Sequence, residues 1–73
     1  MSHIGADLPK RLIRSEMAKR GVGYAELSSR LAEAGVKLSE GALRNKVSRG
    51  AFTAEFFLQA LNAMGVETLR LTE

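Results

Sequence analysis

The sequence has 73 residues, of which 45% are hydrophobic, carries a net charge of +3 and contains no cysteine. This length has room for one small domain, the lack of cysteine excludes a disulfide framework and a thiolate zinc site, and the apolar runs are too short to cross a bilayer. We therefore expect a soluble cytoplasmic protein with a flexible tail over residues 1–6, a folded domain over 7–66 and a C-terminal extension over 67–73.

The first predicted helix starts at Asp7 and ends near Arg20. Aspartate is a favourable N-cap residue, and Pro9 falls in the first turn, where proline is tolerated. The apolar residues of this stretch recur at helical spacing and are expected to face the core: Leu8, Leu12, Ile13 and Met17. Lys19 and Arg20 lie in the last turn, where cations complement the helix dipole, so we expect a structural role for them.

Three Gly-Val pairs, at residues 21–22, 35–36 and 65–66, each follow an apolar periodic run and are predicted to end helices. Glycine adopts the left-handed backbone conformation that follows a helix end at little cost. In such an ending the valine contacts a residue five positions earlier. All of the resulting pairs are apolar: Met17 with Val22, Leu31 with Val36, and Leu61 with Val66.

Two shorter helices follow the first glycine. One is predicted from about Tyr24 to Ala34, with Leu27 and Leu31 one turn apart on its apolar face. The other occupies KLSEGALRNKVSRG, residues 37–50, with Ser39 as its N-cap. In this third helix Leu38 and Leu43 are placed as a hydrophobic staple, Leu43 and Val47 face inward, and Gly50 ends the helix.

The fourth predicted helix begins after the N-cap Thr53, with Phe52 and Phe57 placed as a second staple. Its apolar face continues through Phe56, Ala60, Leu61 and Met64. The residues behind Gly65 alternate in polarity and fit either a short strand or a helical turn. The predicted fold is thus all-α: a compact bundle of four main helices containing a helix-turn-helix, with a short C-terminal strand or helical turn.

Basic charge is concentrated in residues 1–50, which hold ten Lys and Arg against five acidic residues, whereas residues 51–73 hold one against three. This distribution suits an anionic partner such as nucleic acid.

With Leu43 and Val47 inward, the polar residues of the third helix point away from the core. Arginine pairs with guanine and asparagine with adenine through two hydrogen bonds each.

We therefore divide the candidate DNA contacts into two groups. The predicted base-reading residues are Arg44, Asn45, Glu40 and Ser48. The predicted phosphate-contacting residues are Ser39, Lys37, Arg30, Lys46, Arg49 and Arg14. The alternative is that these cations only keep a short surface helix solvated.

The succession YAELSSRL, a glycine turn, ALRNKVSRG and TAEFFLQALNAMGV resembles the Xre/Cro class of bacterial helix-turn-helix repressors over about residues 8–66. The resemblance implies a bundle of four or five helices that binds double-stranded DNA and regulates transcription, and we expect a homodimer. The chain departs from that class between Leu27 and Gly50, because the second helix is about one turn longer and the turn GVKL is wider.

Signatures of catalysis are lacking, since the sequence has neither a P-loop nor a GxGxxG motif and its one histidine, His3, lies in the predicted tail. We expect no enzymatic activity, no cofactor, no metal, no small-molecule substrate and no membrane association. The main rival is a protein-interaction module that holds a partner regulator or toxin through its apolar tail and the surface of residues 52–64. RNA binding is a third possibility, disfavoured because exposed aromatic residues for base stacking are lacking.

Overall fold

The computed structural model describes residues 5–71, which form four α-helices and no strand. The helices are α1 (Leu8–Arg20), α2 (Tyr24–Glu33), α3 (Glu40–Arg49) and α4 (Ala54–Ala63). Their bounds agree with the predicted ones to within a residue, and the all-α class is confirmed. His3 and most of the predicted flexible tail lie outside the described residues, as does the end of the predicted extension.

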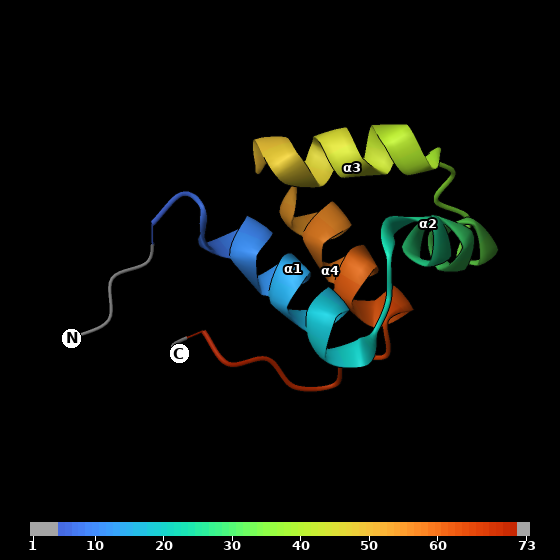
Figure 1. The fold of residues 1–73 in the computed structure, drawn as a ribbon. Coiled ribbons are helices and arrows are strands. Elements are labelled where there is room, and N and C mark those ends of the chain that lie inside the picture. Colours follow the sequence, from blue (N-terminus) through green and yellow to red (C-terminus); the bar gives the residue numbers. More distant parts are fainter. Residues whose placement is uncertain (1–4, 72–73) are drawn as a thin grey trace.

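α1 and α2 each pack against both α3 and α4. Figure 1 shows α3 across the top of the bundle, with its outer side turned away from the other helices, and the C-terminal segment running below α1. The Cα radius of gyration of 11.8 Å is that of a tightly packed small domain. This arrangement leaves one long side of α3 uncovered.

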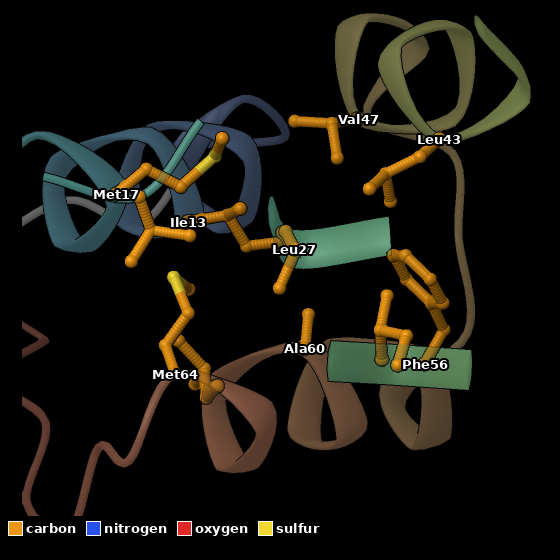
Figure 2. Close-up of a cluster of buried hydrophobic side chains, with 11 residues drawn as sticks. Ile13, Met17, Leu27, Leu43, Val47, Phe56, Ala60 and Met64 are labelled. Carbon is orange, nitrogen blue, oxygen red and sulfur yellow. The ribbon is translucent and has the colours of Figure 1, made fainter. Parts of the chain in front are cut away.

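The core combines side chains from all four helices (Figure 2). Its fully buried large side chains are Ile13, Leu27, Leu31, Leu43 and Val47. The predicted apolar stripe of α1 is buried throughout, and so are Phe56, Ala60, Leu61 and Met64 around α4. α3 contributes only Leu43 and Val47 to this core, so these two side chains fasten it to the bundle.

The predicted Gly-Val helix endings are confirmed. The amide groups of Val22, Val36 and Val66 donate hydrogen bonds to the carbonyl oxygens of Met17, Leu31 and Leu61 at 2.9, 2.8 and 3.0 Å. The intervening glycines have φ angles of 65°, 89° and 80°. Each ending therefore satisfies a carbonyl that the helix leaves free and turns an apolar valine back toward the core.

Substitution of Gly35 by alanine should destabilise the domain by about 1–2 kcal/mol, the cost of left-handed backbone for a residue with a Cβ. A Cβ there meets no atom within 4 Å, so the loss is conformational alone. Gly41→Ala is a matched control, because a Cβ added there also meets no atom within 4 Å. Gly41 differs from Gly35 in lying within α3, where alanine is favoured over glycine. This control should stabilise the domain by up to about 1 kcal/mol. Urea unfolding of both variants measures the two changes, and changes of the same sign would contradict this account.

The side-chain caps of α3 and α4 are as predicted. Ser39 Oγ accepts a hydrogen bond from the amide of Ala42 at 3.1 Å, and Thr53 Oγ1 accepts one from the amide of Phe56 at 3.0 Å. Phe52 stacks on Phe57 with ring centroids 6.2 Å apart, which forms the predicted staple.

Asp7 occupies the N-cap position of α1 but makes no capping hydrogen bond. Its backbone is already helical, at φ −89° and ψ −5°, whereas a capping side chain needs an extended backbone. The carboxylate pairs instead with Arg11 at 3.6 Å.

The C-terminal segment, residues 66–71, forms neither the strand nor the helical turn that was predicted for it. The turn that ends α4 is confined to Met64 and Gly65. A strand requires a neighbouring strand, and the described part of the chain offers none. Val66 and Leu69 pack against the core, so the segment follows the bundle surface as irregular backbone.

Glu16 and Arg20 join the end of α1 to the end of α4. Glu16, whose burial was not predicted, accepts hydrogen bonds from Arg20 Nε at 3.1 Å and Lys19 Nζ at 3.2 Å. Arg20 Nη1 also donates to the carbonyl of Met64 at 3.1 Å. These contacts confirm the structural role expected of Lys19 and Arg20.

The hydrogen bond from Arg20 lowers the pKa of Glu16 below its ordinary value of 4.5, against the opposing effect of burial. A carboxyl with a lowered folded-state pKa stabilises the fold above its unfolded-state pKa, and this stability is lost as pH falls through the folded-state pKa. Glu16→Gln should therefore be less stable than the wild type at pH 7 and lose less stability on acidification to about pH 3. Thermal unfolding at both pH values tests this, with the exposed Glu55→Gln as control; an acid sensitivity like that of the wild type would contradict it.

Candidate nucleic-acid interface

The positions of the two buried residues of α3, Leu43 and Val47, determine which side of this helix is uncovered. Because Leu43 and Val47 are fully buried, a helix of 3.6 residues per turn places Asn45 farthest from the core, with Ala42 and Arg49 beside it. All three of these residues are exposed. Ser39 lies just before the helix, and its hydroxyl is committed to capping Ala42.

Two cations of α1 reach the C-terminal end of α3. Lys10 Nζ donates to the carbonyl of Ser48 at 3.1 Å, and Arg14 Nη2 donates to the Ser48 hydroxyl at 3.1 Å. Positive charge at a helix C-terminus is favourable, which helps to hold both side chains there. Lys10 was not among the predicted site residues, although its spacing of four from Arg14 already put them on one face.

Arg44 and Glu40 lie on the flank of α3 that faces α2. Arg44 Nη2 donates to Glu40 Oε2 at 3.0 Å, and the guanidinium carbon lies 5.2 Å from the centre of the Tyr24 ring. The guanidinium thus has an ion-pair partner and an aromatic face at once. Both residues remain half exposed, but their contacts draw them toward α2.

The opposite flank of α3 carries a hollow of about 350 Å³. It is lined by Leu38, Ala42, Asn45, Lys46, Arg49 and Ala51. Lys46 is half-buried, with its ammonium group 5.2 Å from the centre of the Phe56 ring. The hollow is therefore lined by three apolar residues and by three of the predicted site residues, Asn45, Lys46 and Arg49.

Five cations of the described residues are paired with acidic side chains. The ion pairs among residues 5–71 join Arg11 to Asp7, Lys19 and Arg20 to Glu16, Arg30 to Glu26, and Arg44 to Glu40. Within that range no ion pair involves Lys10, Arg14, Lys46 or Arg49. Lys37 and Arg70 are likewise without an ion pair in this range but lie elsewhere, so four of the six unpaired cations gather along α3 and the adjoining part of α1.

Two predicted phosphate contacts stand apart from this group. Besides its pairing with Glu26, Arg30 donates to the carbonyl of Ala63 at 3.4 Å, which directs it toward the end of α4. Lys37 is exposed in the connection between α2 and α3. That connection is fixed by the Ser28 hydroxyl, which donates to the carbonyl of Leu38.

Other kinds of site are not evident over residues 5–71. That part of the chain contains no cluster of three or more His, Cys, Asp or Glu side chains that could hold a metal ion. None of its helices has both the length and the hydropathy of a transmembrane span.

Comparison with known proteins places the chain in one family. No curated protein and no solved structure matches it significantly. The resemblance to the Xre/Cro class accordingly stays a prediction. One family model matches residues 6–69, which is nearly the whole chain and all four helices. The chain belongs to the family described as Domain of unknown function (DUF6471).

Proposed function

We propose that this protein is a cytoplasmic homodimer that binds double-stranded DNA through α3 and thereby regulates transcription. The observation that carries the proposal is that four of the six cations without an ion pair in the described residues lie along an uncovered helix and the helix beside it. α3 has ten residues and is therefore about 15 Å long. The major groove of DNA, about 12 Å wide, admits such a helix.

The contacts divide between base edges and phosphates. The outer side of α3 faces the base edges, while Lys10, Arg14, Lys46 and Arg49 contact phosphates on either side of the groove. α2 packs against α3 and braces it against the DNA backbone, as the first helix of a helix-turn-helix does. Lys37, in the connection between these helices, adds a further phosphate contact.

The proposed dimer uses the side of the bundle away from α3. Leu58 on α4 is 62% exposed and Leu71 is 53% exposed, although both are large and apolar. Leu58 also lines a hollow of about 310 Å³ between α4 and the C-terminal segment. A second copy covering this surface would leave both α3 helices free for two half-sites and double the phosphate contacts.

Fluorescence anisotropy of a labelled random duplex, titrated with the protein between about 50 and 200 mM salt, tests DNA binding. Five phosphate contacts per chain predict a slope of about −4.5 for log affinity against log salt concentration, and twice that for a bound dimer. A stoichiometry of two chains per duplex would support the dimer, and one chain per duplex would contradict it. Absence of binding at the lowest salt would reject the proposed function.

Protein interaction is the second candidate, because apolar side chains outside α3 are also accessible. Phe52 and Phe57 are half-buried and line a hollow of about 270 Å³ with Pro9, Thr53 and Ala54. Binding of a partner regulator or toxin to this surface would need no DNA. RNA binding is less well supported, since Tyr24 and all three phenylalanines are buried or half-buried and cannot stack freely on bases.

A further inference from the structure

Asn45 is the predicted base-reading residue that points most directly away from the core. It lies opposite the buried anchors Leu43 and Val47, and within residues 5–71 its side chain makes no hydrogen bond with another residue. A free carboxamide offers one donor and one acceptor side by side. Adenine presents the complementary pair, the N7 acceptor and the N6 donor, in the major groove.

Arg44 is placed less favourably for base reading. To reach guanine, its side chain would have to leave both Glu40, at 3.0 Å, and the Tyr24 ring, at 5.2 Å. Leaving them would also separate Glu40 from its partner. Arg44 would therefore recognise a G·C pair only at the expense of existing contacts, whereas Asn45 meets an A·T pair with no side-chain hydrogen bond to break in the described chain.

The surroundings of Asn45 suit the other half of an A·T pair. Ala42 is three residues earlier on the same helix, so its methyl group lies beside the carboxamide. Both residues line the hollow, whose remaining apolar lining comes from Leu38 and Ala51. Thymine presents in the major groove a C5 methyl group that cytosine lacks, and this group favours an apolar contact of this kind.

Charge at the rim of the hollow fixes the orientation of the DNA. Lys46 and Arg49 belong to the same hollow and carry no carboxylate partner in the described part of the chain. Phosphate groups held by these two cations would set the register of α3 along the groove. Asn45 and Ala42 would then face the edge of one base pair.

We propose that α3 recognises an A·T base pair, with the Asn45 carboxamide on adenine and the Ala42 methyl group against the thymine methyl group. This inference rests on the proposed DNA binding and names the sequence feature that the DNA must contain. Arg44 is a positioning residue that braces α3 against α2 and reads no base.

Selection of duplexes from a random library, followed by sequencing, tests the proposal with wild-type protein, Asn45→Ala and Arg44→Ala. We expect the wild type and Arg44→Ala to enrich sites sharing an invariant A·T pair, and Asn45→Ala to lose that preference by about 5- to 150-fold. An invariant G·C pair that disappears in Arg44→Ala would overturn the proposal. Binding without any preference would also overturn it while leaving DNA binding intact, and no binding at all would reject both.

A second measurement isolates the methyl contact. In the selected duplex the thymine is replaced by deoxyuridine, which lacks only the C5 methyl group. The wild type should bind the deoxyuridine duplex several-fold more weakly than the thymine duplex, whereas Ala42→Gly should bind both equally. Because each variant serves as its own reference, any change in the stability of α3 cancels. Equal affinities in the wild type would overturn the role of Ala42.

Discussion

Replacement of Lys46 and Arg49 together by alanine is expected to weaken binding to a random duplex by roughly 10- to 100-fold at about 100 mM salt. The slope of log affinity against log salt concentration should become shallower by about 2, one for each lost phosphate contact. Neither cation belongs to an ion pair in the described chain, so their removal leaves no carboxylate unpaired. Anisotropy titrations at several salt concentrations measure both quantities.

The matched control is the double variant Lys19→Ala with Arg70→Ala, which lowers the net charge equally. Both residues are exposed, and neither belongs to α3 or to the hollow on its flank. Glu16 keeps its hydrogen bond from Arg20 when Lys19 is removed. This control should change affinity only slightly through the overall charge. If both double variants weakened binding to the same extent, the effect of charge would not be local to α3.

Leu43→Ala is expected to destabilise the domain by about 2–5 kcal/mol, because it removes a fully buried side chain from the centre of the core. Small domains have a total stability of roughly 5–15 kcal/mol, so this one substitution removes a large share of it. It also removes one of the two anchors of α3. Urea unfolding followed by circular dichroism gives the change in free energy.

Leu58→Ala makes the same chemical change on an exposed position of α4. It should alter the free energy of unfolding by no more than about 0.5 kcal/mol in the monomer. Measurement at low protein concentration keeps any contribution from dimer formation small. A similar loss in both variants would contradict the difference in burial between Leu43 and Leu58.

Much of the fold could be predicted from local signals. Ser39 and Thr53 mark helix starts, and the Gly-Val pairs mark helix ends, because these signals act within a few residues of one another. The inward-facing residues follow from helical spacing alone. Asp7 shows the limit of such reasoning: its residue type favours a cap, but the local backbone decided whether its side chain could act as one.

The candidate site could be predicted only in part. Spacing around Leu43 and Val47 identified the exposed side of α3, including Asn45 and Ser48, with Arg49 predicted at its border. It could not reveal that Arg44 meets Tyr24, that Arg30 meets the carbonyl of Ala63, or that Lys10 meets the carbonyl of Ser48. Each of these contacts joins residues distant in sequence and depends on how the helices pack.

That α3 contributes only Leu43 and Val47 to the buried core also bears on how the family can diversify. Exposed positions such as Gly41, Ala42, Asn45 and Arg49 contribute nothing to the buried core, so they can mutate while the scaffold is retained. Relatives could therefore acquire new targets by surface changes on a single helix. The same separation makes α3 a convenient place to randomise when retargeting this small domain in the laboratory.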